Sequence, residues 1–265
     1  MGKSKSSNVQ SLFQEAHDQG NLSMASMQAL DVVDIGAQIQ DALGVPADDV
    51  ASSEVFLVTI DVDDSGSIRF VTGNTEAVRD GHNGVLDALL KSKQKSGILA
   101  HSRYINGELL YPYCPLDKAV RLDTHNYNPG GGTPLRDSIV ETLGIVLAKS
   151  QEFARNGVPV RTGTLIVTDG NDEGSWKANP SSVRSVVTDM LKAETHIIAA
   201  MGIDDGHTDF RAVFQEFGIP DQWILTPKNT PSEIRKAFVV FSQSAVRASQ
   251  NAASFSKTAL GGFGV

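Results

Sequence analysis

The sequence has one cysteine, no long apolar run and no excess of basic residues, and each absence excludes a class of protein. Cys114 alone cannot build a disulfide framework, a cysteine-rich zinc site or a CxxC redox centre. No stretch of about 18 apolar residues is present, so we expect no membrane-spanning helix. The 23 basic and 31 acidic residues leave a net charge of −8, whereas duplex-binding domains usually carry a basic face. We therefore expect a cytoplasmic protein that binds neither nucleic acid nor membrane.

The 265 residues, 40% of them hydrophobic, are enough to bury a sizeable core. Apolar β-rich runs predict strands at 55–60, 98–105, 108–113, 164–168, 196–201 and 223–225. Helical spacing of apolar residues predicts helices at 74–93, 134–153, 180–192, 210–217 and 232–248. Asn106-Gly107 indicates a tight hairpin between two of the strands. This alternation predicts an α/β fold with a mostly parallel sheet that is flanked by helices on both faces.

The chain divides into three segments. Residues 1–50 form an N-terminal arm that we expect to be partly disordered and partly helical, 51–250 form the main domain, and 251–265 form a flexible tail rich in Ala, Ser and Gly. Apolar residues recur in the arm at loosely helical spacing: Val9, Leu12, Phe13, Ala16, Met27, Leu30, Val33 and Ile39. We expect these helices to pack on the domain or on a partner, and residues 9–43 are a candidate surface for self-association.

Three polar features lie next to the ends of the predicted strands or at the start of a predicted helix. A parallel sheet binds its ligands at the carboxyl ends of its strands. Residues 61–67 (DVDDSGS) follow the first strand directly. The glycine loop 130–132 precedes Thr133 at the start of a helix, and Thr168-Asp169-Gly170 ends the central strand. We expect these features to meet at one edge of the sheet.

Together the three features offer five oxygen ligands. Asp63 and Asp169 supply carboxylates, and Ser65, Ser67 and Thr133 supply hydroxyl groups. An all-oxygen set suits a hard cation such as Mg²⁺, with Mn²⁺ or Ca²⁺ as alternatives. Two carboxylates only neutralise a divalent ion, so an open coordination position would attract another anionic oxygen. That ligand could be an Asp or Glu of a partner protein.

The pattern of these residues resembles the binding site of a known protein family. Asp63-x-Ser65-x-Ser67, with Thr133 and Asp169 far along the chain, resembles the metal-ion-dependent adhesion site of von Willebrand factor type A domains. Any one of these features alone is commonly just a polar loop or turn. Their joint order, each at a predicted strand end or helix start, is what makes the resemblance specific.

The resemblance covers roughly residues 54–245 and points to one branch of the family. Residues 131–135 (GGTPL) and 168–170 (TDG) look like the bacterial and intracellular branch. Residues 241–244 (FSQS) are similar to TerY-type domains of tellurite-resistance and stress gene clusters.

The resemblance implies a Rossmann-like sheet of about six strands with one antiparallel edge strand. It also implies direct metal contacts from Ser65, Ser67 and Thr133, and direct or water-mediated contacts from Asp63 and Asp169. The implied activity is cation-dependent protein binding without catalysis. Family context adds a bacterial or phage stress-response or chaperone-like assembly, with an AAA+ ATPase or a stress-cluster protein as partner.

A phosphatase remains the alternative. Asp61-Val62-Asp63 after an apolar strand also resembles the start of haloacid-dehalogenase-type phosphatases, in which Asp61 would be the nucleophile and Asp63 the general acid and base beside Mg²⁺. Thr168 and the pair Asp204-Asp205 would supply the later motifs. That chemistry requires neither the second serine of the first motif nor the glycine loop, so we favour the docking module.

Trp176 lies in the loop after Asp169. Two placements are open for its side chain. Exposed beside the metal site, it would anchor an interface, because Trp is enriched at binding hot spots. Packed under the loop, it would only stabilise the domain.

Overall fold

The computed structural model describes residues 4–31 and 35–264. Residues 1–3 and 32–34 of the predicted arm and Val265 of the predicted tail therefore lie outside the described residues. Six strands form one sheet in the order β3-β2-β1-β4-β5-β6. Their bounds are β1 Val55–Val62, β2 Ile98–Tyr104, β3 Leu109–Pro115, β4 Val160–Thr168, β5 His196–Gly202 and β6 Ile224–Leu225.

All neighbouring strands run parallel except the edge strand β3, which is antiparallel to β2. The predicted α/β class, with its single antiparallel edge strand, is thus confirmed. The predicted hairpin connects β2 and β3, and Gly107 adopts a φ of +100° in its turn. Every residue of β1 is buried, as expected for a central strand with both faces covered.

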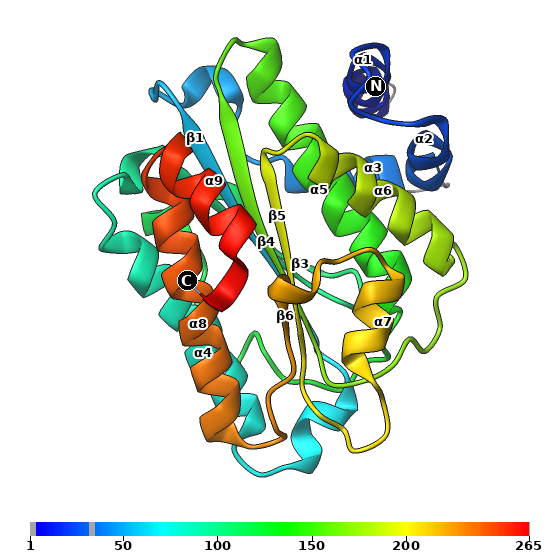
Figure 1. Ribbon diagram of the computed structural model, residues 1–265, viewed down its shortest axis with the longest axis vertical. Coiled ribbons are helices and arrows are strands. Elements are labelled where there is room, and N and C mark those ends of the chain that lie inside the picture. The colour runs from blue at the N-terminus through cyan, green and yellow to red at the C-terminus, as the bar shows by residue number, and fades with distance from the viewer. Residues whose placement is uncertain (1–3, 32–34, 265) are drawn as a thin grey trace.

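Helices cover both faces of the sheet (Figure 1). The helices are α1 Ser4–Asp18, α2 Met24–Leu30, α3 Ile35–Ala42, α4 Asn74–Leu90, α5 Leu135–Arg155, α6 Pro180–Lys192, α7 Phe210–Glu216, α8 Pro231–Gln250 and α9 Ala252–Gly261. Helices α4, α8 and α9 lie on one face, and α5, α6 and the arm lie on the other (Figure 1). Among the described helices, none is both long enough and apolar enough to cross a membrane.

The arm packs on its own domain. Helices α1, α2 and α3 contact α5 and α6, and Leu12 and Ile39 are fully buried. Gly144 on α5 allows the side chains of Leu30 on α2 and Ile39 on α3 to approach this helix closely, because a Cβ at this position would lie 2.9 Å from atoms of both. The apolar residues of the arm that are buried here are covered by the domain itself. Self-association through 9–43 would therefore have to use side chains that the arm leaves exposed, among them Met24.

The C-terminal segment differs from the flexible tail predicted for 251–265. The Asn251 side chain accepts a hydrogen bond from the Ser254 N–H (2.8 Å) and begins α9. Phe255 is buried, and the Phe263 ring packs edge-on against Trp223 at 4.9 Å between centroids. The composition suggests disorder, but a helix cap and two aromatic side chains anchor the segment to the domain.

The helix after the glycine loop begins one residue later than predicted. Pro134, predicted to occupy the first helical position, is the N-cap of α5, and the helix begins at Leu135. Side chains of the 172–175 loop accept hydrogen bonds from the first turn: Asp172 from the Arg136 N–H (3.0 Å) and Ser175 from the Asp137 N–H (3.1 Å). The start of α5 is therefore fixed to the loop that follows β4.

Candidate metal-binding site

Two buried carboxylates lie side by side where adjacent strands end. Strands β1 and β4 are neighbours with Val62 opposite Val167, so the residues that follow them emerge at the same edge. The Asp63 N–H donates to the Val167 carbonyl (3.0 Å), and the Asp169 N–H donates to Asp63 Oδ2 (3.1 Å). Asp63 is fully buried and Asp169 nearly so. The register of the sheet thus brings together two residues that are 106 positions apart.

Three side-chain oxygens form a small triangle at this edge. Ser65 Oγ lies 2.8 Å from Ser67 Oγ, Ser67 Oγ lies 2.6 Å from Asp169 Oδ1, and Ser65 Oγ lies 3.2 Å from the same carboxylate oxygen. Octahedral Mg²⁺ has bonds of about 2.1 Å, which places adjacent ligand oxygens about 3.0 Å apart. The triangle therefore has the size of one face of such an octahedron.

Asp63 holds the loop in shape. Its Oδ1 accepts the Ser65 N–H (2.7 Å), and its Oδ2 accepts the Thr168 hydroxyl (2.7 Å) as well as the Asp169 N–H. The buried Tyr127 hydroxyl donates to the Asp63 carbonyl (2.6 Å). The sequence placed Thr168 at the end of the central strand but did not indicate that its hydroxyl group holds Asp63. No sequence signal marks Tyr127.

The glycine loop is tied to the same segment. The Gly130 and Gly131 N–H groups donate to the Asp64 carbonyl (2.7 and 3.0 Å), and the Gly66 N–H donates to the Gly131 carbonyl (3.2 Å). A Cβ on Gly131 would lie 3.3 Å from Asp64 Oδ2, closer than most side chains tolerate. Glycine therefore allows two backbones to run against each other, and this contact brings Thr133 to the site.

Thr133 completes the predicted set. It is 5% exposed, and its carbonyl accepts the N–H groups of Leu135 (2.7 Å) and Glu173 (2.8 Å). Its hydroxyl oxygen lies 3.5 Å from the position that a Cβ on Gly170 would occupy, so it faces the residue after Asp169. The structure thus gathers all five sequence-predicted residues at one edge of the sheet.

The carboxylates of the site are costly to hold in their charged form. Burial, and next the charge of Asp63, raises the pKa of Asp169 to about 6 in spite of hydrogen bonds from Ser67 and Ser65. Burial also raises the pKa of Asp64 to about 6. A divalent ion would relieve the cost of holding such carboxylates in their charged form. The described residues contain no group of three or more His, Cys, Asp or Glu that could hold a metal ion. The candidate set at this edge consists of two carboxylates and three hydroxyl groups, and their oxygens are the ligand type that hard ions prefer.

Comparisons with known proteins show the fold. No family model matches the sequence, and no curated protein matches it. The pilus adhesin SpaC from Lactobacillus rhamnosus GG is similar over 73% of this chain, with 11% identity and a TM-score of 0.55. Proximal thread matrix protein 1 from the mussel byssus is similar over 71%, with 16% identity and a TM-score of 0.50. A von Willebrand factor type A protein from Catenulispora acidiphila is similar over 74%, with 15% identity and a TM-score of 0.49.

These matches cover only part of the proteins concerned. The chain spans 31% of the adhesin, 47% of the thread protein and 43% of the Catenulispora protein. The likeness to SpaC and to the thread protein shows that this α/β sheet architecture is shared with a domain of larger proteins.

Asp61, the nucleophile of the phosphatase alternative, lies in a buried position between the sheet and α5. It is fully buried, and its Oδ2 accepts the hydroxyl groups of Ser138 (2.8 Å) and Thr142 (3.0 Å) on α5. Burial raises its pKa to about 6, against the opposing charge of the neighbouring Arg103, which itself pairs with Glu141 at 2.7 Å. A nucleophile must reach a phosphate from solvent, whereas Asp61 belongs to a buried polar cluster between sheet and helix.

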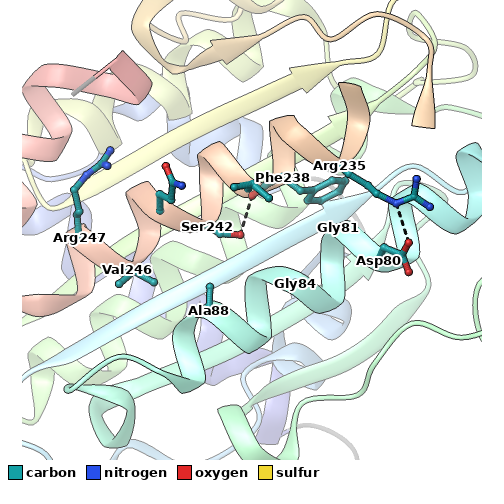
Figure 2. A pocket seen from close by; sticks show the side chains of 11 residues that line it. Asp80, Gly81, Gly84, Ala88, Arg235, Phe238, Ser242, Val246 and Arg247 are labelled. Atoms are coloured by element: carbon teal, nitrogen blue, oxygen red, sulfur yellow. Dashed lines mark hydrogen bonds and ion pairs between the residues drawn. The ribbon is translucent and has the colours of Figure 1, made fainter. Parts of the chain in front are cut away.

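A separate groove of about 580 Å³ lies between α4 and α8 (Figure 2), and none of its lining residues belongs to the oxygen triangle. Gly84 and Ala88 have small or no side chains and so leave the space of the groove unfilled. Phe238 and Val246 line the groove, and Arg247 lies at one end of it (Figure 2). Its lining is almost entirely apolar, so it offers no set of oxygen ligands for a cation.

The open question about Trp176 is answered by the structure. Its side chain is 79% exposed, so it is not packed under the loop. The loop itself is fixed, because the Asp137 carboxylate accepts three consecutive backbone N–H groups that start with that of Trp176.

Proposed function

We propose that this chain is a divalent-cation-dependent protein-docking module of the von Willebrand factor type A kind. Asp63, Ser65, Ser67, Thr133 and Asp169 hold Mg²⁺, or Mn²⁺ or Ca²⁺ in its place. The observation that carries the proposal is the triangle of Ser65, Ser67 and Asp169 oxygens, whose edges of 2.6 to 3.2 Å fit one face of an octahedral cation.

The composition of the site suits docking. Three hydroxyl groups add no formal charge, so the two carboxylates only balance a divalent ion. The bound ion supplies an electrophilic centre that accepts one carboxylate oxygen from a partner. The Asp63 carboxylate accepts the backbone N–H groups of Ser65 and Asp169 and so positions both residues. The glycine loop presents Thr133 beside them. A partner Asp or Glu at the remaining coordination position is the ligand that this arrangement favours.

The biological setting that we propose is a bacterial or phage stress-response or chaperone-like assembly in the cytoplasm, of the TerY-like branch. Its partner is an AAA+ ATPase or a stress-cluster protein that presents an acidic residue. Support comes from the sequence resemblance of residues 131–135, 168–170 and 241–244.

Calorimetry and capture together test the proposal. We expect the full chain to bind Mg²⁺ in isothermal titration, and Ser67→Ala to weaken binding by about tenfold or more, because one ligand oxygen is lost. Ser256→Ala is the matched control, since this exposed serine lies on α9 and only donates to the Ala252 carbonyl (3.0 Å). In the same buffers, immobilised protein should capture a partner from native lysate with Mg²⁺ but not with EDTA.

Two outcomes would refute the proposal. Equal Mg²⁺ affinity in wild type and Ser67→Ala would show that the oxygen triangle is not the cation site. Capture of the same partner in EDTA, or by Ser67→Ala, would show that docking does not depend on the metal. Mass spectrometry of the captured protein identifies the partner and tests the stress-response setting.

A further inference from the structure

Two loops beside the candidate metal site each expose an aromatic side chain. Phe70 ends the short 3₁₀ helix Gly66–Phe70, three residues after Ser67, and is 85% exposed. Trp176 lies in the loop after Asp169 and is 79% exposed. Rings of this size carry a large apolar surface and dominate the energetics of interfaces. Each ring follows, along the chain, a segment that supplies candidate metal ligands, which indicates a contact surface that extends beyond the cation.

Both rings are carried by backbone that is held in place. Ile68 is fully buried and fixes the short helix that carries the phenyl ring. The Asp137 carboxylate accepts the N–H groups of Trp176 (3.1 Å), Lys177 (3.1 Å) and Ala178 (2.7 Å). An aromatic side chain on an ordered backbone loses little further conformational entropy on binding. The two rings are thus preorganised to receive apolar groups.

Each aromatic residue has a cation next to it in the sequence. Arg69 precedes Phe70, and its Nη2 atom lies 3.4 Å from the position that a Cβ on Gly130 would occupy, which places it at the glycine loop. The Lys177 Nζ atom lies 5.1 Å from the centre of the Trp176 ring. Within the described part of the chain, neither cation forms an ion pair with a carboxylate. Both positive charges are therefore free to meet acidic groups of a partner.

We propose that this face binds a protein segment in which the metal-binding Asp or Glu has apolar residues near it and is accompanied by further acidic residues. The apolar residues pack on Phe70 and Trp176, and the additional acidic residues pair with Arg69 and Lys177. The inference rests on the proposed cation-dependent docking and adds the chemistry of the partner sequence to it.

Selection from random dodecapeptides displayed on phage tests this inference without knowledge of the partner. The full chain is immobilised with Mg²⁺, and bound phage are eluted with EDTA so that only metal-dependent binders are recovered. We expect enriched peptides to carry an Asp or Glu with apolar residues near it. Parallel selections use the double variant Phe70→Ser/Trp176→Ser and the control Leu260→Ser. Leu260 is 84% exposed on α9, on a helix that contributes nothing to the site.

The double variant should enrich acidic peptides without the apolar preference, while Leu260→Ser should enrich the wild-type pattern. For a peptide selected on wild type, we expect each aromatic substitution to raise Kd by about tenfold or more. Arg69→Ser and Lys177→Ser should raise Kd for peptides with additional acidic residues, and less so as the salt concentration rises. Titration with Mg²⁺ should give the wild-type affinity for every one of these variants, which shows that the site is intact.

The outcomes separate the two proposals. Acidic peptides without apolar neighbours, or the same apolar pattern on wild type and the double variant, would overturn the inference and leave metal-dependent docking standing. If EDTA elutes no peptide from the wild type and calorimetry detects no Mg²⁺ binding, the proposed function fails and the inference fails with it.

Discussion

His196 begins β5 at the end of the sheet opposite the candidate site, and its environment keeps it neutral. Burial lowers its pKa from 6.5 to about 4, and its Nδ1 lies 2.8 Å from the Thr162 hydroxyl oxygen. The unfolded chain takes up a proton below pH 6.5, whereas the folded chain does not until about pH 4. The stability that neutral His196 contributes is therefore complete above pH 6.5 and is lost as the pH falls toward 4.

We predict that this loss appears as a difference between wild type and His196→Gln, which cannot be protonated. The free energy of unfolding of wild type minus that of the variant should fall by roughly 1.4 kcal/mol per pH unit below pH 6.5. Urea unfolding at several pH values between 8 and 5 measures this difference. Subtracting the free energy of unfolding of the variant cancels the contributions of the other titrating groups, including the acidic residues of the candidate site. A difference that is constant with pH would contradict the assigned protonation state.

Helices α4 and α8 pack closely at one glycine and leave space at another. A Cβ on Gly81 would lie 2.1 Å from an atom of the Phe238 ring, whereas nothing lies within 4 Å of a Cβ on Gly84 (Figure 2). The two glycines lie on the same helix, three residues apart. They therefore form a matched pair for separating helix propensity from packing.

We predict opposite effects for alanine at these positions. Gly84→Ala should stabilise the protein by about 0.5–1 kcal/mol, because alanine loses less backbone entropy than glycine in a helix. Gly81→Ala should destabilise it by about 1–3 kcal/mol, because the buried Phe238 ring must move. Midpoints of chemical unfolding measure both effects. Destabilisation by both substitutions would mean that the groove closes over Gly84 in solution.

The arm, the sheet and the C-terminal helix share one buried core. Leu12 in α1 and Phe255 in α9 belong to the same apolar cluster as the strands. On the far side of α5 from the sheet, Arg155 pairs with Glu15 at 2.7 Å. From contacts of this extent we expect the described residues to unfold as one cooperative unit.

We predict that Leu12→Ala lowers the stability of the entire molecule by about 2–5 kcal/mol, because it leaves a cavity in the common core. Circular dichroism and tryptophan fluorescence should report one shared unfolding transition. Met24→Ala is the control within the arm, since Met24 is 60% exposed and its loss should change stability by less than about 0.5 kcal/mol. Separate transitions for the arm and the sheet would contradict a single core.

Local patterns in the sequence were sufficient to predict the six strands and the helices α4 to α8 in their order along the chain. The buried run of β1, the hairpin turn at Asn106-Gly107 and the apolar periodicity of α4 to α8 depend on neighbours along the chain. The same holds for the polar residues that follow strand ends, because a parallel sheet collects its carboxyl ends at one edge. This is why Asp63 and Asp169 could be placed together before the structure was known.

Contacts between distant segments decided the rest. The triangle of Ser65, Ser67 and Asp169 oxygens depends on the register of β1 against β4, and the hydrogen bond of Tyr127 to the Asp63 carbonyl joins segments 64 residues apart. The ordered α9 and the exposed Trp176 ring likewise follow from how Phe255 packs and how Asp137 holds a loop. Burial and hydrogen bonding between remote residues set these features, and no local pattern of residue types encodes them.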